Sequence, residues 1–328
     1  MTERLHSRLA GFAAVLAFCV IAAGAWVRLS DAGLGCPDWP GCYGHLTWPQ
    51  ADAEITVADT RYPDRPVETP KAWKEMAHRY LAGALGLVVL GLAALALRRR
   101  RYEASARWRL PTAILALVLA QALFGMWTVT LKLTPLVVTA HLLGGILTFT
   151  LLVLHYRQLT ADRAPTLQRH RPWLIAALLV LVGQIFLGGW TSTNYAALAC
   201  PDFPTCQGQW WPEVDFSAGF TLLRDFGMDH EGGRLQQPAR TAIHISHRLG
   251  ALMATLIIGA CALSLLRDRD VRATGVVLGG SLLVQISLGL ANVLAKLPLA
   301  NAVAHTAVAA LLLAVLADAL NRARSPSW

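Results

Sequence analysis

The chain has 328 residues and a formal net charge of +9, with 55% hydrophobic and 15% charged residues. Such a low charged fraction beside such a high apolar fraction is unusual for a soluble globular protein. The length alone would suit about two soluble domains, but the composition argues against them and indicates a membrane protein.

Long apolar runs recur along the whole chain, and a membrane-spanning helix needs about 20 predominantly apolar residues. The first run follows Arg4 and Arg8 and resembles a signal peptide. It is longer than a signal core and no small-residue cleavage site clearly ends it, so we predict a retained helix. In total we predict an all-α polytopic membrane protein with eight spans, at residues 8–29, 75–97, 110–131, 135–157, 172–193, 242–265, 272–294 and 298–320.

Basic residues gather at the termini and in the connections after the second, fourth and sixth spans. They include Arg98 to Arg101, the segment 157–171, and Arg267, Arg269 and Arg272. The excess of Lys and Arg marks the cytoplasmic side of a membrane protein. We therefore expect both termini in the cytoplasm, in a bacterial-type inner (plasma) membrane. The positive charge is then a signal of orientation, and we expect no nucleic-acid partner.

The two halves of the sequence repeat each other. Two outer loops are long, at about 30–74 and 194–241, and the other two are short. An offset of 164 residues pairs Trp26 with Trp190, Cys36 with Cys200, Cys42 with Cys206, Gln121 with Gln285, Gly125 with Gly289, Lys132 with Lys296 and His141 with His305; an offset of 169 pairs His78 with His247 and Arg79 with Arg248. We predict two tandem four-helix bundles, residues 1–160 and 161–328, related by a pseudo-two-fold axis along the membrane normal.

Four histidines lie in apolar runs, at a similar depth near the outer side. His78 and His141 belong to the first half, and His247 and His305 to the second. Helical bundles hold cofactors between facing helices, and two imidazoles on either side of a porphyrin give bis-histidine haem ligation. One alternative is that each histidine is a hydrogen-bonded packing residue. Another is zinc or copper, which would need a further ligand such as Glu75.

Glu75 precedes His78 by about one helical turn and shares its face, whereas His244 occupies the corresponding position before His247. Glu75 is a candidate catalytic carboxylate, or alternatively a polar residue that favours the start of a helix. Three arginines near the outer side, Arg28, Arg79 and Arg248, are candidates to bind carboxylates of a cofactor in bidentate fashion. Alternatively, their side chains extend to the membrane interface.

Four of the six cysteines lie in the outer loops, on the oxidising side of the membrane where disulfides persist. We expect one disulfide between Cys36 and Cys42 and another between Cys200 and Cys206. A zinc site built from all four is an alternative, although their spacing is unusual for it. Cys200–Cys206 is expected to be structural, whereas Cys36–Cys42 is either structural or a dithiol pair that carries electrons.

Together these residues give the chain a resemblance to the haem A synthase family, the membrane enzymes that convert haem O into haem A for terminal oxidases. The resemblance covers nearly the whole chain. The residues that carry it are the run Gly24 to Cys36 with Pro37-Asp38-Trp39-Pro40-Gly41-Cys42, then Glu75 to Arg79, His141, His244 to Arg248, and His305.

The resemblance implies a role for each half. His247 and His305 match the ligands of a resident haem b, His78 and His141 match the histidines of the substrate site, and Glu75 matches an essential carboxylate. The implied reaction oxidises a methyl group of haem O to a formyl group, through two hydroxylations and loss of water. Glu75 would stabilise developing positive charge or act as a base toward water.

We therefore expect a haem O oxidoreductase with haem b as its cofactor, supplied by a haem O synthase and serving oxidase assembly. The isoprenoid tail of haem O favours entry from the membrane lipid. The alternatives are a b-type di-haem cytochrome that exchanges electrons with quinone, a non-catalytic haem carrier, and a thiol–disulfide membrane enzyme. The sequence assigns no role to His45, His230 or His244.

Overall fold

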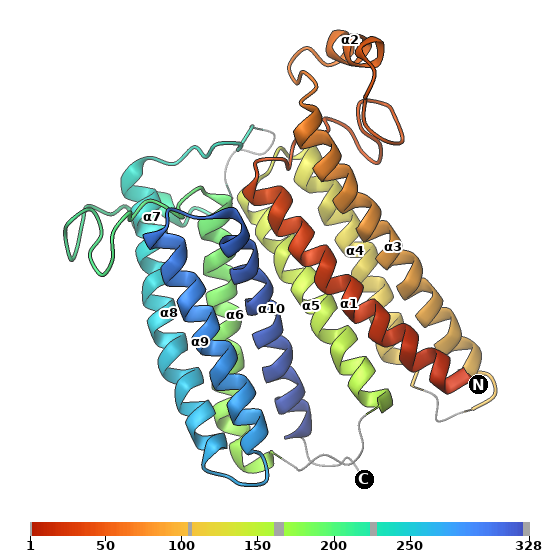
Figure 1. The fold of residues 1–328 in the computed structure, drawn as a ribbon, viewed down its shortest axis with the longest axis vertical. Helices are drawn as coiled ribbons and strands as arrows, with labels where there is room; N and C mark the ends of the chain where they lie inside the picture. Colours follow the sequence, from red (N-terminus) through yellow and green to blue (C-terminus); the bar gives the residue numbers. More distant parts are fainter. Residues whose placement is uncertain (1, 104–106, 161–166, 224–227, 324–328) are drawn as a thin grey trace.

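The protein is all-helical in the computed structural model, which describes residues 2–103, 107–160, 167–223 and 228–323. Within these residues, eight long helices match the eight predicted spans (Figure 1). They are α1 (Thr2–Leu29), α3 (Thr69–Arg100), α4 (Arg109–Thr130), α5 (Pro135–Thr160), α6 (Arg171–Thr193), α8 (Gln237–Leu266), α9 (Arg272–Leu294) and α10 (Leu299–Arg322). The prediction of eight spanning helices is confirmed.

Two of these helices begin earlier than predicted. The apolar runs of α3 and α8 start near residues 75 and 242, but the helices themselves start at Thr69 and Gln237. Each has a proline in its first turn, where the missing N–H is not needed and the fixed φ suits a helix. The first turns of both helices are polar and lie outside the apolar region.

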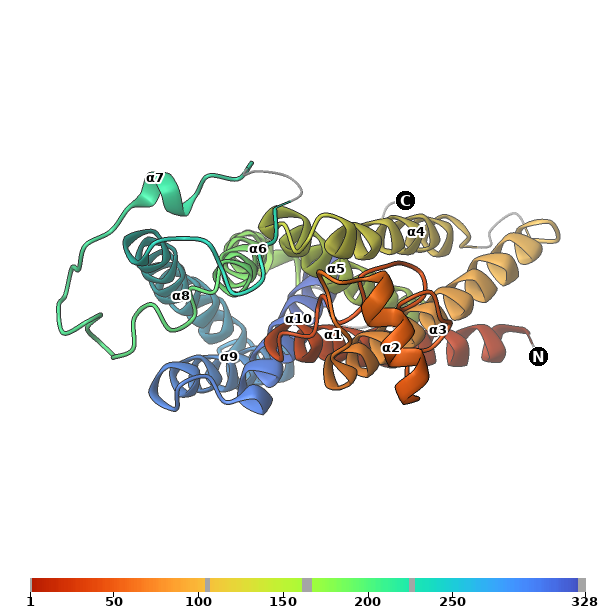
Figure 2. The same cartoon turned by 90° about the horizontal axis from the view of Figure 1, so that it is seen from above.

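The long helices form two four-helix bundles that lie side by side (Figures 1 and 2). In the first bundle α1, α3, α4 and α5 pack in a ring, and in the second α6, α8, α9 and α10 do the same. The bundles meet where α10 packs against α1 and α5, and where α5 packs against α6. The predicted boundary at 160/161 adjoins residues 161–166, which lie outside the described segments.

Small side chains line the buried face of α1. Ala10, Ala13, Ala14 and Ala17 are all buried, and their spacing places them on one helical face. Leu312 of α10 belongs to the same buried cluster. Small residues let helices approach closely, which favours packing where the surrounding lipid is as apolar as the side chains.

The turns of the two halves share unusual backbone conformations. Left-handed φ angles occur in pairs separated by 164 residues: Asp31 and Tyr195 (48° and 53°), Tyr43 and Gln207 (54° and 56°), Lys132 and Lys296 (47° and 56°), and Leu133 and Leu297 (59° and 61°). Such angles are uncommon for residues other than glycine. The repeat in the sequence is therefore also a repeat in local structure, while the symmetry axis between the halves stays a prediction.

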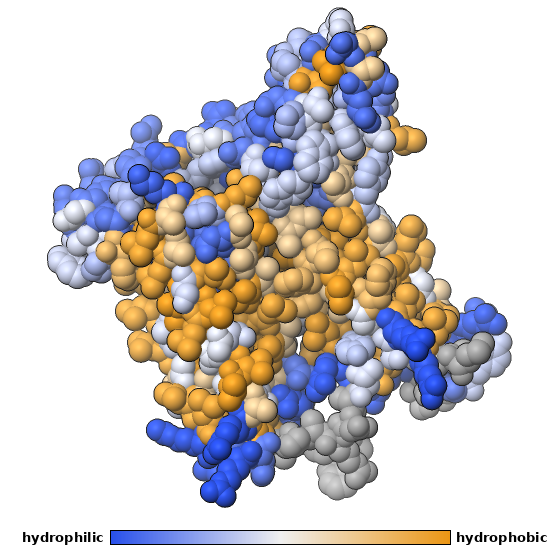
Figure 3. Space-filling view, viewed as in Figure 1, coloured by the Kyte–Doolittle hydropathy of each residue, from blue (hydrophilic) through white to orange (hydrophobic). Residues whose placement is uncertain are grey.

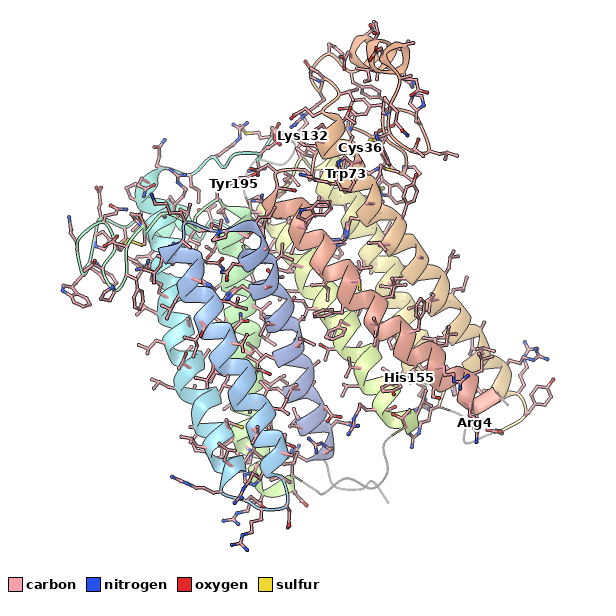
Figure 4. The ribbon with its side chains drawn as sticks, viewed as in Figure 1. Arg4, Cys36, Trp73, Lys132, His155 and Tyr195 are labelled. Atoms are coloured by element: carbon pink, nitrogen blue, oxygen red, sulfur yellow. A yellow bond between two sulfur atoms is a disulfide. The ribbon has the colours of Figure 1, made fainter. Side chains whose placement is uncertain are left out.

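On the face shown in Figure 3, apolar residues cover the middle of the molecule as a belt, with polar residues at both ends. The eight apolar helices and this belt identify a multi-pass membrane protein. Figure 4 shows Cys36, Trp73, Lys132 and Tyr195 at one end of the helices, and Arg4 and His155 at the other. We call the first end the outer end.

The outer loops contain helical segments that the sequence did not predict: α2 (Asp52–Arg61) in the first loop and α7 (Phe216–Gly219) in the second. A short turn, η1 (Gln168–His170), precedes α6 at the opposite end of the molecule. The carboxylate of Glu54 accepts hydrogen bonds from the backbone N–H groups of Gln50 and Ala51, at 2.9 and 3.2 Å. Acidic residues in the first turn favour a helix, so the run from Asp52 to Arg61 carried a signal for α2.

A segment of the second outer loop crosses to the first half. We call residues 228–235 the strap. Arg65 forms ion pairs with Asp229 and with Glu231, the latter at 2.5 Å, and Lys71 lies 3.5 Å from Glu231. The backbone N–H of His230 donates to the carbonyl of Lys132 at 3.1 Å. The strap thus ties the outer loops of the two halves together.

Candidate functional site

The structure places two of the predicted histidines near the outer end of each bundle. His78 lies on α3 and His141 on α5 in the first bundle, and His247 lies on α8 and His305 on α10 in the second. All four side chains are only partly buried. Each bundle therefore contributes two imidazoles from different helices, the arrangement from which bundles build cofactor sites.

A glycine of a neighbouring helix lies against the ring of each histidine. In the first bundle, a Cβ atom added at Gly24 would lie 2.9 Å from Cε1 of His78, and one added at Gly125 would lie 3.5 Å from Cε1 of His141. In the second bundle, a Cβ added at Gly188 would lie 3.2 Å from Cε1 of His247, and one added at Gly289 would lie 3.1 Å from Cε1 of His305. Contacts below 3.0 Å are essentially never seen for a real Cβ. The missing side chain at Gly24 therefore makes room for the His78 ring.

The hydrogen bonding of these rings is incomplete. Among the described residues, Nδ1 of His78, His141 and His305 is buried without a partner. Buried polar atoms are normally paired, so the pattern argues against histidines that merely satisfy a packed core. No group of three or more His, Cys, Asp or Glu side chains suited to a metal ion occurs in the described segments. Paired imidazoles without a third ligand fit a planar porphyrin better than a zinc ion.

Glu75 is buried, with 4% of its surface exposed, and both of its oxygens are engaged. Oε2 accepts a hydrogen bond from the backbone N–H of Cys36 at 2.9 Å, and Oε1 pairs with Nη2 of Arg79 at 2.5 Å. The carboxylate thus joins α3 to the first cysteine of the outer loop. Its predicted catalytic role stays a prediction, because these contacts alone account for its burial.

His244, the counterpart of Glu75, has the opposite hydrogen-bonding role. It is buried, and its Nδ1 lies 2.9 Å from the carbonyl oxygen of Ala196, so it donates where Glu75 accepts. The corresponding positions in the two bundles therefore differ in hydrogen bonding, an acceptor in the first and a donor in the second. Glu75 lies one turn before His78 on α3, whereas α8 has His244 one turn before His247.

Arg79 and Arg248 hold the two cysteine loops by matching sets of hydrogen bonds. Nη1 of Arg79 donates to the carbonyls of Asp38, Pro40 and Gly41, at 3.0, 3.2 and 2.5 Å. Arg248 donates to the carbonyls of Thr205, Cys200 and Asp202, at 2.8, 3.1 and 2.7 Å. Both arginines therefore anchor loops, a role the sequence did not suggest.

Arg28 connects the two halves. Its Nη2 donates to the carbonyl of Ser192 at 2.6 Å, and its guanidinium lies 4.3 Å from the ring centre of Tyr195. Tyr195 in turn donates from its hydroxyl to Asp31 at 3.0 Å. Within the described residues, Nε of Arg28 and Nε of Arg248 are buried without a partner, so both retain a donor for a bound anion.

Both predicted disulfides are present. Cys36 and Cys42 are bonded at 2.02 Å, and Cys200 and Cys206 at 2.00 Å. Each closes a hairpin in which an aspartate accepts two backbone N–H groups: Asp38 from Tyr43 and Gly44, and Asp202 from Gln207 and Gly208. The hydroxyl of Thr205 and these N–H groups hold the pKa of Asp202 below its usual range.

Other histidines lie away from the two sites. Nε2 of His6 and Nε2 of His155 are 2.9 Å apart at the inner end, and both rings are buried. His170 contacts Ser264 and Asp268 at 3.0 Å. Of the outer-loop histidines without a predicted role, His45 pairs through its backbone with Cys42, and His230 belongs to the strap.

Sequence reasoning missed Gln184, whose amide nitrogen lies 3.0 Å from Nδ1 of His247. It could have been found, because it precedes Gly188 by four residues on α6 and so lies on the same helical face. The first half has Val20 at the corresponding position before Gly24.

Comparison with known proteins gives a consistent result. Residues 7–317 match the COX15-CtaA family, described as cytochrome oxidase assembly protein. The haem A synthase of Shewanella oneidensis is 45% identical over 92% of this chain and 92% of its own length. That of Rhizorhabdus wittichii is 30% identical, over 92% of this chain and 89% of its own, and that of Caulobacter vibrioides 28%, over 95% and 94%.

Proposed function

The chain belongs to the COX15-CtaA family of cytochrome oxidase assembly proteins, and on that premise we propose that it is a haem A synthase. It oxidises a methyl group of haem O to a formyl group, and terminal oxidases take up the product. The relatives that bear this name align with nearly the full chain. The observation that supports the proposal is that each bundle contributes two histidines from different helices, while the turn before His78 holds the buried carboxylate of Glu75 and the turn before His247 holds His244.

The second bundle, within residues 161–328, is proposed to hold the resident cofactor, haem b, through His247 and His305. Haem b would supply one-electron redox chemistry at this site. At the position of Glu75 this bundle has His244, which donates to Ala196, and this suits a site that carries electrons and makes no product. Gly188 and Gly289 leave space beside the two rings.

The first bundle, within residues 1–160, is proposed to bind the substrate haem O through His78 and His141. Its isoprenoid tail favours entry from the surrounding lipid. Glu75 would lie near the reacting methyl group, where a carboxylate stabilises developing positive charge or accepts a proton from water. Because both of its oxygens already have partners, it would act by releasing one of them, the pair with Arg79 or the N–H of Cys36.

Arginines at the outer end are proposed to pair with haem propionates. The free Nε atoms of Arg28 and Arg248, unpartnered within the described residues, support this role. The support is weaker for Arg79, whose Nη1 and Nη2 are taken up by loop carbonyls and Glu75. We also propose that both termini lie in the cytoplasm. We further propose that Cys36–Cys42, next to the substrate site, is the disulfide to test for a redox role.

The test is to express the full chain in a host that makes haem O but no haem A, and to separate the extracted haems by chromatography. A haem A peak with its hydroxylated precursor would support the proposal. The contrary result is a folded preparation with a bis-histidine spectrum that contains only unchanged haem O and haem B. If this result persists after the host's electron acceptors are restored, it would indicate a cytochrome or a haem carrier.

A further inference from the structure

The residues behind the two equivalent histidines, His78 and His247, are different. In the second bundle, the amide of Gln184 lies 3.0 Å from Nδ1 of His247 and donates to the carbonyl of the same residue at 3.0 Å. In the first bundle the position equivalent to Gln184 is Val20. Nδ1 of His78 is accordingly buried without a partner among the residues described.

The residue packed against the Gln184 amide also differs from its equivalent in the first bundle. Gly250, one turn after His247, packs against Gln184, and a Cβ added at Gly250 would collide with Oε1 of that glutamine and lie 2.9 Å from Leu187. The equivalent of Gly250 in the first half is Leu81. Next to His247 there is thus a polar side chain with a glycine beside it, whereas the equivalent positions next to His78 are Val20 and Leu81.

Of the other two glutamines, Gln121 also packs against a glycine three residues after a histidine, but no hydrogen bond joins it to the ring of His141 among the described residues, where Nδ1 is buried without a partner. Gln285 lies 3.3 Å from Nε2 of His305, a contact that iron bound at the same nitrogen would replace. Its equivalent, Gln121, has its amide turned against Gly144, where the second half has Val308. Gln184 therefore differs from both, since it contacts the ring nitrogen that stays available when Nε2 binds iron.

We propose that Gln184 is a positioning residue that fixes His247 as a permanent haem ligand, and that its absence behind His78 makes the first site exchangeable. The inference rests on the proposed function and adds the reason why one haem stays and the other leaves. A partner on the second ring nitrogen fixes the orientation of a ligating histidine and raises its basicity. An unsupported imidazole releases its metal more readily.

The amide has an unused atom for this purpose. Imidazole that binds iron through Nε2 carries its hydrogen on Nδ1, which then needs an acceptor. Oε1 of Gln184 is buried and has no partner within the described segments. A half-turn of the amide exchanges its nitrogen and oxygen, so that Oε1 accepts from Nδ1 in place of the hydrogen bond that Nε2 donates to the carbonyl of His247.

The experiment compares variants of the full chain, purified in detergent, by haem content per protein, by the rate of haem transfer to apomyoglobin, and by the haem midpoint potential. Gln184→Val is expected to release haem b on the order of 10-fold to 100-fold faster than the wild type. Gly250→Ala displaces the same amide without altering it and is expected to show the same effect. Gln184→Glu keeps an acceptor, and is expected to retain haem and lower the midpoint potential.

Two further variants separate positioning from packing. Gln121→Val makes the same change in the first bundle, where the amide contacts Gly144, and is expected to leave the release of haem b unchanged. Val20→Gln combined with Leu81→Gly moves the second-bundle arrangement into the first. It is expected to raise the haem retained per chain.

The inference is overturned if Gln184→Val, eluting and melting as the wild type does, releases haem at the wild-type rate with an unchanged midpoint potential. It is equally overturned if Gln121→Val accelerates release of haem b to the same extent as Gln184→Val. Failure of the proposed function would look different, because His247→Ala would then leave the b-type haem of the purified protein in place.

Discussion

The carboxylate of Glu75 accepts the backbone N–H of Cys36 at 2.9 Å, so the residue proposed for catalysis also holds one end of a disulfide. The second bundle contains no such link within the described residues, because His244 donates to Ala196 instead. The proposed chemistry and the outer loop are therefore joined in the first bundle by one side chain.

Replacing Glu75 with Gln tests the charge separately from the shape. The amide oxygen of glutamine can still accept from Cys36, but the ion pair with Arg79 and the negative charge are lost. We expect haem A formation to fall by on the order of 10²-fold or more, the range for loss of a general acid–base group, while the disulfide still forms. The measurement is haem A per protein in the haem O host, with alkylation of free thiols as the check on folding. Undiminished haem A formation would remove Glu75 from the mechanism.

The glycines beside the histidines should differ in tolerance according to their spacing. Gly24→Ala would place a methyl group 2.9 Å from the His78 ring and displace it, whereas Gly125→Ala leaves an ordinary contact of 3.5 Å with His141. We expect the first variant to bind added haem at the first site at least about 10-fold more weakly, since a displaced ligand loses its geometry. The second serves as the matched control. Equal binding by both, measured by haem titration in detergent, would contradict the assignment.

The arginine anchors should control the stability of the disulfide hairpins. Arg248→Ala removes three hydrogen bonds to the hairpin closed by Cys200–Cys206, each worth about 1 kcal/mol or somewhat more for a charged donor. We expect thiol reductants to open this disulfide at least about 10-fold faster in the variant. Cys36–Cys42, held by Arg79, is the internal control and should be reduced at its original rate. Mass spectrometry after alkylation resolves the two pairs.

Acid should loosen the second hairpin through Asp202. Its pKa is lowered in the folded protein by Thr205 and by the N–H groups of Gly208 and Gln207, so the ionised form favours the hairpin. That contribution is present above the ordinary aspartate pKa of about 4 and is lost as pH falls through the lower, folded value. Amide exchange at Gln207 and Gly208, corrected for its intrinsic pH dependence, should accelerate there. In Asp202→Asn this acid-dependent step should be missing.

Much of the fold could be predicted from the sequence because the membrane imposes simple rules. Apolar length marked each span, and the repeated Cys, Trp, Lys and His positions marked the two halves. The starts of α3 and α8 could not be read from hydropathy, since the first turns at Thr69 and Gln237 are polar and lie outside the apolar region. α2 was missed because the prediction searched for apolar runs.

The candidate site was predicted less completely than the fold. Their similar depth in the sequence predicts that His78 pairs with His141 and His247 with His305, and this pairing stays a prediction. The partners of Arg79 and Arg248 were out of reach, because they are backbone carbonyls, which carry no side-chain signal in a sequence. Gln184 was missed for another reason: its significance depends on the contrast with Val20, which appears only when the residues behind the ligands are compared.

The ion pairs of the strap make the contact between the two outer loops sensitive to salt, whereas the packing within the apolar belt is not. Arg65, Asp229 and Glu231 are partly exposed to water, so dissolved salt weakens their attraction. The helices below are held by lipid and by apolar packing, which salt hardly weakens. The contact between the two halves within the membrane is therefore insensitive to salt, whereas the contact between their outer loops weakens as the salt concentration rises. On the proposed orientation, the composition of the extracytoplasmic fluid would set how tightly the two outer loops hold each other.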